Sequence, residues 1–141
     1  MNAPVNKPLE TLPIHELNRY VHLLTPDEQT LVHGNLSDRD ILREALALLR
    51  QPIIDHRQFG NLLTLHQKNL REAKRISTPK IDRMIDAALD AGAYGAKING
   101  SGGGGCMFAY APENAGYVAE AIERAGGRAY LINVDKGTWV N

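Results

Sequence analysis

The stretch GAYGAKINGSGGGGC, residues 92–106, holds seven glycines in fifteen positions, four of them consecutive. A glycine in place of alanine in an ordered segment costs about 0.5–1 kcal/mol through lost chain entropy. Because a folded domain is stable by only about 5–15 kcal/mol, several such positions together need a structural or functional reason. The elements on either side of the run give the first part of that reason.

The segments that flank the glycine run have the short apolar pattern of strands. AYGAKIN precedes the run and CMFAYAP follows it, which predicts two strands joined by the glycines. A helix begins with Thr78 as its cap and Pro79 at its first position, and Gly92 ends it. A further helix is predicted over residues 115–125, and RAYLINVD, residues 128–135, alternates as a strand ahead of the terminal GTWVN.

The N-terminal half, from Leu9 to about residue 91, has a helical pattern. Thr25 is a capping residue followed by proline, with a glutamate three positions after the cap, which predicts a helix start there. Ser37 and Asp38 repeat this logic and predict a second start. A third helix follows Pro52 and stops near Ser77. Helices followed by strands, a helix and a strand predict an α+β domain whose antiparallel sheet is covered on one face.

Length and composition predict one globular domain over residues 9–141, preceded by a disordered lead over residues 1–8. The chain has 141 residues, 43% hydrophobic and 23% charged, which is the balance of a soluble protein. Sixteen basic residues equal sixteen acidic ones, so no net field attracts nucleic acid or an anionic membrane. The single cysteine, Cys106, excludes an internal disulfide and suits a cytoplasmic location. No apolar run approaches the roughly 20 residues of a membrane span.

The glycine run admits four interpretations. Residues 100–105 satisfy G-x-G-x-x-G, but the dinucleotide fingerprint requires a helix after the loop, and here a strand is predicted. The phosphate loop of the Walker type fails because no Gly-Lys-Ser/Thr ends the run. A flexible hairpin connection remains open, although two residues suffice for a hairpin. The fourth interpretation is a loop whose bare backbone N–H groups face a ligand that any Cβ would keep away.

The residues around the run resemble a known family. GAKINGSGGGGC, preceded by Ser-Thr-Pro-Lys-Ile-Asp at residues 77–82 and by a helix that ends Ala-Gly-Ala, is similar to the third conserved motif of the GHMP kinases. The segment LHQKNL, residues 65–70, is similar to the galactokinase-like and heptose-phosphate-kinase-like sugar branch. The resemblance spans about residues 55–140. Galactokinases usually carry a bulky aromatic residue within the run, which is uninterrupted here.

The resemblance implies the C-terminal domain of an ATP-dependent sugar or sugar phosphate kinase, with a ferredoxin-like antiparallel sheet packed against helices. The glycine loop would lie at the cleft that holds the phosphates and the acceptor, and the implied cofactor is ATP with Mg²⁺. Phosphoryl transfer depends on positioning and charge neutralisation, and backbone amides directed at phosphate oxygens serve both. The cofactor-binding candidates are Gly100, Ser101, Gly102, Gly103, Gly104 and Gly105. The substrate-binding candidates are Lys97, Asn99 and Ser101. No residue of this chain is assigned a catalytic or metal-binding role.

One part of the family pattern does not occur in these 141 residues. Family members carry an N-terminal motif of the form Pro-x-x-x-Gly-Leu-x-Ser-Ser-Ala that wraps the ATP phosphates, and the sequence contains no such string. We therefore expect the chain to have no kinase turnover alone and to need an N-terminal kinase domain, on a separate chain or lost, as its partner. The alternative is a non-catalytic ligand-sensing or assembly module that self-associates.

Several candidate residues have ordinary structural explanations of equal or greater weight. Lys97 either faces phosphate or is a surface strand lysine, and Asn99 and Ser101 either bind an acceptor or serve turn chemistry. His66 lies on an apolar helical stripe, which favours a half-buried, satisfied histidine over a base. Cys106 is expected to pack in the core. The histidines show no metal-site spacing.

Overall fold

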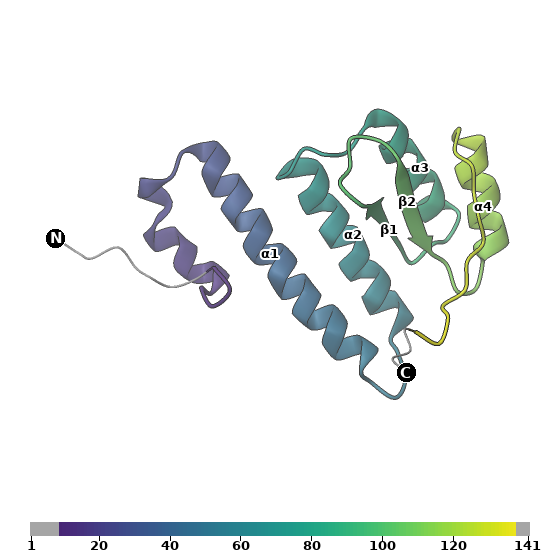
Figure 1. The fold of residues 1–141 in the computed structure, drawn as a ribbon, viewed down its shortest axis with the longest axis horizontal. Coiled ribbons are helices and arrows are strands. Elements are labelled where there is room, and N and C mark those ends of the chain that lie inside the picture. Colours follow the sequence, from purple (N-terminus) through teal and green to yellow (C-terminus); the bar gives the residue numbers. More distant parts are fainter. Residues whose placement is uncertain (1–8, 138–141) are drawn as a thin grey trace.

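The computed structural model describes residues 9–137, which form helices around a two-stranded sheet (Figure 1). The elements in chain order are the short 3-10 helices η1 (Ile14–Arg19) and η2 (Val21–Leu23), the helices α1 (Pro26–Leu49), α2 (His56–Glu72) and α3 (Pro79–Asp90), the strands β1 (Gly95–Asn99) and β2 (Cys106–Tyr110), and the helix α4 (Ala115–Arg124). The predicted lead over residues 1–8 lies outside the described residues, as does nearly all of GTWVN.

Helix α1 begins as predicted but continues through the second predicted start. Thr25 and Glu28 form a reciprocal capping box, with the Thr25 N–H donating to Glu28 Oε2 at 2.8 Å. The start predicted at Ser37 is wrong, because no proline or turn interrupts the helix there. The side chains of Ser37 and Asp38 accept hydrogen bonds from Asn69 Nδ2 of α2 instead, at 2.9 and 2.8 Å.

Helix α2 starts at a cap and ends earlier than predicted. The Asp55 side chain accepts a hydrogen bond from the Gln58 N–H at 2.9 Å. The helix ends at Glu72 rather than near Ser77, because Arg75 takes a left-handed φ of 53° that turns the chain. Helix α3 begins and ends as predicted, since Thr78 caps it and Gly92 follows its last turn with a φ of 97°.

The two predicted strands are confirmed as an antiparallel pair. Their register places Lys97 opposite Phe108 and Ile98 opposite Met107. Helix α2 packs along β1, and α4 packs against α3. The main core lies between these elements and consists of Leu70, Ile81, Met84, Ile85, Ala88, Ala93, Ala96, Ile98 and Val118. A smaller core under the 3-10 helices consists of Leu12, Leu17 and Leu36.

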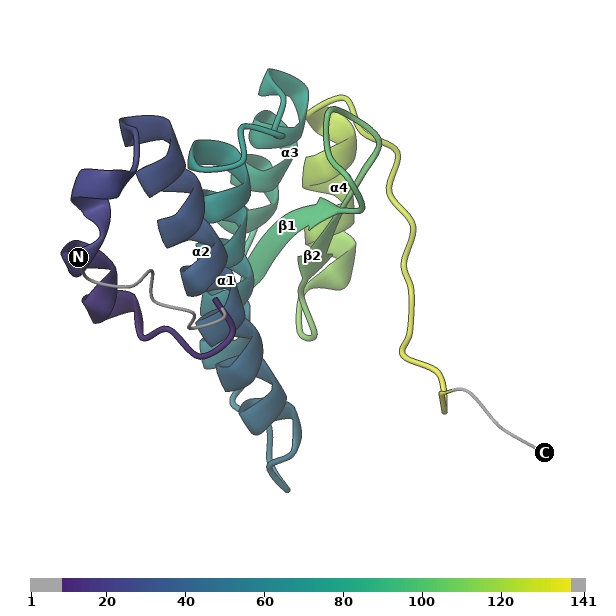
Figure 2. The same cartoon turned by 60° about the vertical axis from the view of Figure 1, so that its left-hand side comes forward.

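The third strand, predicted over residues 128–135, does not form. This segment pairs with no strand among residues 9–137, and Figure 2 shows it running clear of the helices beyond α4. The alternating apolar pattern favours a strand, but the backbone N–H and C=O groups of a strand need a neighbouring strand as their hydrogen-bond partner. The described fold is therefore a mostly helical α+β domain with a two-stranded antiparallel sheet, and the expected ferredoxin-like sheet is not shown.

Within residues 9–137, every helix is too short or too polar to cross the apolar part of a membrane.

Candidate functional site

The glycine run forms a loop between β1 and β2 whose backbone conformation is largely restricted to glycine. Five residues have a positive φ, a region in which a residue with a Cβ is strained. These are Gly100 (87°), Gly102 (79°), Gly103 (73°), Gly104 (138°) and Gly105 (81°). The glycines are therefore required first by backbone conformation, which composition alone did not reveal.

The middle of the loop is fixed to the segment between α2 and α3. The Gly103 N–H donates to the Ile76 carbonyl oxygen at 2.7 Å. A Cβ on Gly102 would lie 2.6 Å from both Ile76 Cβ and Ile76 O, so the two backbones approach more closely than any side chain at position 102 allows. The loop is thus held in a defined position relative to the start of α3.

The remaining loop positions are open. A Cβ built on Gly100, Gly103, Gly104 or Gly105 would meet no atom outside its neighbours within 4 Å. Packing against other residues does not explain these four glycines. Their positive φ values change the direction of one peptide unit after another within a short loop. Successive backbone N–H groups in such conformations form anion-binding concavities. This geometry fits a phosphate group, and it favours the ligand-facing interpretation over a plain connection.

Asn99 and Ser101 lie where the sequence places them, at the end of β1 and in the loop. The side chains of both are exposed and form no hydrogen bond with another residue of the range 9–137, so these side chains are accessible to a ligand. Cys106, expected in the core, is instead exposed at the start of β2, because the loop carries the strand end beyond the helices.

Lys97 is neither buried in the core nor free in solvent. Its ammonium Nζ donates to the Ile98 carbonyl oxygen at 2.6 Å and lies 5.3 Å from the centre of the Phe108 ring. Partial burial lowers the pKa of Lys97, and the Asp38 carboxylate opposes that shift. The cation is therefore directed along the sheet toward α1 and α2 rather than into bulk water.

Asp38 joins Lys97 to a group of polar side chains that the sequence did not predict. Its Oδ2 atom lies 2.6 Å from Lys74 Nζ and 3.7 Å from His66 Nε2, and its Oδ1 accepts from Asn69 at 2.8 Å. These residues come from α1, α2, the end of α2 and β1. A single sequence carries no signal for this convergence, because the partners are up to 59 positions apart and only the folded chain brings them together.

His66 is half-buried in this group, as its stripe predicted. Burial lowers the pKa of His66, and this effect outweighs the Asp38 carboxylate, which raises it; Lys97 and Lys74 lower it further. The folded state thus binds the His66 proton less well than the unfolded chain does. Stability contributed by the neutral ring is present above the ordinary pKa and is lost as the pH falls below it.

We expect the His66→Gln variant to lose stability more slowly than the wild type on acidification. Between pH about 7.5 and about 5, the wild-type free energy of unfolding should fall more than that of the variant, since glutamine does not titrate. Urea unfolding followed by circular dichroism at each pH measures both. Parallel curves for the two proteins would contradict the assignment.

Gln67 is the second functional-site residue that sequence reasoning missed. Its side chain is 2% exposed, its Oε1 accepts the Ile98 N–H at 2.9 Å, and its Nε2 donates to Ser77 Oγ at 3.4 Å. Ser77 Oγ in turn donates to Asp82 Oδ1 at 2.6 Å. One side chain therefore ties α2 both to the strand that enters the loop and to the segment on which the loop rests.

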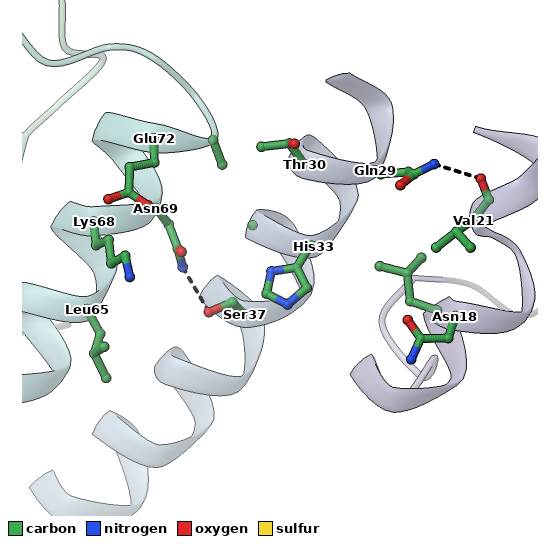
Figure 3. A pocket seen from close by; sticks show the side chains of 13 residues that line it. Asn18, Val21, Gln29, Thr30, His33, Ser37, Leu65, Lys68, Asn69 and Glu72 are labelled. Atoms are coloured by element: carbon green, nitrogen blue, oxygen red, sulfur yellow. Dashed lines mark hydrogen bonds between the residues drawn. The ribbon is translucent and has the colours of Figure 1, made fainter. Parts of the chain in front are cut away.

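A separate open pocket of about 570 Å³ lies between α1, α2 and the 3-10 helices (Figure 3). Figure 3 shows His33 and Thr30 of α1 facing the pocket from one side and Lys68 and Glu72 of α2 from the other. No residue of the glycine loop lines it. Its charged side chains are exposed helix residues that form no buried polar anchor, so the loop is the stronger candidate for phosphate. Residues 9–137 contain no group of three side chains suited to a metal ion.

Comparison with known proteins places the chain in a family. The family described as GHMP kinases C terminal matches residues 42–129, and the chain belongs to it. The mevalonate kinase of Thermococcus onnurineus is 46% identical over 81 residues, 57% of this chain and 24% of that protein. The mevalonate kinase of Thermococcus gammatolerans is 44% identical over 79 residues, 56% and 23% of the two chains.

Galactokinases are also similar, over a shorter segment. The Bos taurus galactokinase is 41% identical over 64 residues, which is 45% of this chain and 16% of that protein. The present chain therefore matches about a quarter or less of the length of these kinases. The expected resemblance to the family is confirmed, and the similarity to mevalonate kinases is longer and higher than that to the galactokinase.

Proposed function

We propose that this chain is the C-terminal part of an ATP-dependent kinase that phosphorylates a small alcohol, and that residues 100–105 hold phosphate oxygens through backbone N–H groups. The observation that carries the proposal is the loop itself, with five positive-φ glycines and four positions open to solvent. Its anchoring to Ile76 sets the amides in place before a ligand binds, which is what electrostatic stabilisation requires.

ATP with Mg²⁺ is the cofactor that this family implies, and the loop fits its phosphates. When bound, ATP supplies the phosphoryl group that is transferred. Because the Gly103 N–H already donates to the Ile76 carbonyl oxygen, the chain's own contribution is to orient phosphate oxygens at the other backbone amides of residues 100–105. Since residues 9–137 offer no cluster of acidic ligands, the Mg²⁺ ligands would come from the nucleotide and from another part of the kinase.

The acceptor is proposed to approach the loop from the β1 side. Asn99 and Ser101 are exposed there and can bind a hydroxyl group. Lys97 would have to release the Ile98 carbonyl oxygen before its ammonium could reach the same ligand. A sugar or sugar phosphate was expected from the sequence. The longer and higher similarity to mevalonate kinases supports mevalonate as the first acceptor to test, with galactose second.

The proposed partner is an N-terminal kinase domain that carries the ATP-binding motif missing from this sequence. The matched segment is 24% of the Thermococcus onnurineus mevalonate kinase and 16% of the Bos taurus galactokinase, which supports the proposal of a further kinase part. We propose that residues 9–141 act as one domain and have no turnover alone. The non-catalytic assembly module stays as a second candidate because residues 128–135 expose apolar side chains.

A chimera tests whether the loop works in catalysis. Residues 42–129 of this chain replace the corresponding segment of the Thermococcus onnurineus mevalonate kinase, and ADP release is measured with mevalonate or galactose as the acceptor. We expect Mg-ATP-dependent phosphorylation by the chimera. The Gly103→Val change should reduce kcat/KM at least about a hundredfold, the size of the loss of one stabilising contact in an active site, because the valine side chain would fill the open space at the loop and strain a backbone whose φ is 73°.

Two controls keep the chimera decisive. Gly116→Ala lies in α4, where a Cβ meets no atom within 4 Å, and it should leave turnover unchanged. Thermal unfolding of each variant shows whether it is folded. A folded chimera without phosphorylation, or full activity with Gly103→Val, would overturn the proposal.

A further inference from the structure

The β1 edge of the sheet is covered by a helix, whereas the β2 edge is not. Along β1, helix α2 covers the edge, and the Gln67 side chain accepts the Ile98 N–H that points outward. Met107 lies opposite Ile98. Because hydrogen-bonded and non-hydrogen-bonded pairs alternate in an antiparallel sheet, the backbone N–H and C=O groups of Met107 point away from β1, and so do those of Ala109 two positions on. No described residue bonds these groups of Met107 and Ala109, so the β2 edge is open.

The open edge lacks the features that usually prevent strand pairing. Natural sheet edges are protected by charged residues, prolines, bulges or a covering helix. The β2 sequence CMFAY contains neither charge nor proline, and the helix that covers an edge of this sheet covers the other one. The β2 edge therefore offers the backbone groups of Met107 and Ala109 to a further strand.

The same chain also carries a strand without a sheet. Residues 128–135 have the composition of a strand, and Tyr130, Leu131, Ile132 and Val134 are 68%, 69%, 82% and 102% exposed. The backbone of this segment makes a single hydrogen bond to another described residue, from the Ala129 N–H to Glu123 Oε1 at 3.4 Å. Its charges lie at the ends, at Arg128 and Asp135, which leaves the middle uncharged, with Asn133 as its polar residue beside the apolar ones.

We infer that two copies of this chain form a symmetric dimer in which residues 128–135 of each copy pair with the β2 edge of the other. One copy provides both an open edge and an unpaired strand, but does not pair them with each other. A two-fold dimer makes each contact twice, as isologous interfaces do. The inference stands on the strand and edge alone and does not depend on kinase activity.

The expected contact is large enough for a stable dimer. Burying one large apolar side chain removes on the order of 100 Å² from water. The four exposed side chains of each segment, together with the surface that they cover on the partner, come to about 1,600 Å² for both copies, the size of a standard specific interface. The covered backbone groups of Met107 and Ala109 would also gain their missing partners.

Sedimentation equilibrium of the full chain across a wide concentration range tests the dimer. We expect a dimer in the wild type, and at least a tenfold weaker dimer in Ile132→Lys and in Val134→Lys. Ile53→Lys is the matched control, because Ile53 is 87% exposed and lies in the α1–α2 connection, outside both β2 and residues 128–135, and it should dimerise like the wild type. All four proteins should show the same helical circular dichroism.

Amide hydrogen exchange then locates the contact. The Phe108 N–H is paired with β1 in either state, whereas the N–H groups of Met107 and Ala109 should become protected only as the dimer forms. A chain that stays monomeric at all concentrations would overturn the inference. So would a dimer that Ile132→Lys and Val134→Lys leave intact, or one in which Met107 and Ala109 stay unprotected because another polypeptide is the true occupant.

Discussion

The Gly95→Ala variant should lose about 4 kcal/mol or more of its free energy of unfolding, and we expect it to be the most destabilising single methyl group in this chain. An alanine Cβ at position 95 would lie 2.0 Å from the Gly60 oxygen and 2.8 Å from the Gly60 Cα, all of them backbone atoms. Overpacking usually costs about 1–3 kcal/mol because side chains shift. Here helix α2 must move away from β1, which also breaks the Gln67 bond to Ile98.

The matched control is Gly116→Ala, at an open position inside α4. Since alanine is the better helix former, this variant should gain about 0.5–1 kcal/mol. Urea unfolding followed by circular dichroism compares the two variants with the wild type. A Gly95→Ala protein as stable as the wild type would mean that α2 and β1 are not in backbone contact.

The second large effect is expected at Gly102, in the glycine loop. An alanine there takes a left-handed conformation that costs about 1–2 kcal/mol, and its Cβ crowds Ile76 at 2.6 Å, which adds about 1–3 kcal/mol. We expect the Gly102→Ala variant to lose about 3 kcal/mol of its free energy of unfolding.

Gly103→Ala separates these two contributions. Gly103 has nearly the same φ, 73° against 79°, but its Cβ would meet no atom within 4 Å. Its variant should therefore lose only the conformational part, about 1–2 kcal/mol. The difference between the free energies of unfolding of Gly102→Ala and Gly103→Ala, obtained from their unfolding curves, measures the cost of the contact with Ile76. Equal losses would show that the loop is not pressed against the α2–α3 segment.

The sequence predicted elements that depend on local signals. Helix α3 carries a cap, a proline, an apolar stripe and a final glycine within sixteen residues, and its bounds are correct. The false helix start at Ser37 has a capping residue but no preceding break, so the helix continues. The third strand failed for a different reason, since an apolar alternation indicates strand propensity but says nothing about which ladder is available.

The candidate site could be proposed from the sequence only where it is continuous along the chain. The glycine loop, Lys97, Asn99 and Ser101 follow one another, so the sequence alone makes them candidates. Asp38 and Gln67 were not, because their roles arise from contacts with residues about thirty positions away. A polar residue in a helix has the same sequence pattern whether it faces water or a buried strand edge, and the difference is made by tertiary packing.

The contact between the loop and Ile76 also determines how much order a ligand must impose. With Gly102 and Gly103 already fixed to the chain before α3, the backbone freedom of these two residues is lost on folding, at about 1–2 kcal/mol per residue. Gly100 and Ser101 before the contact, and Gly104 and Gly105 beyond it, retain more freedom to adjust. An incoming phosphate would therefore order four peptide units rather than six, which would leave more of its binding energy available as affinity.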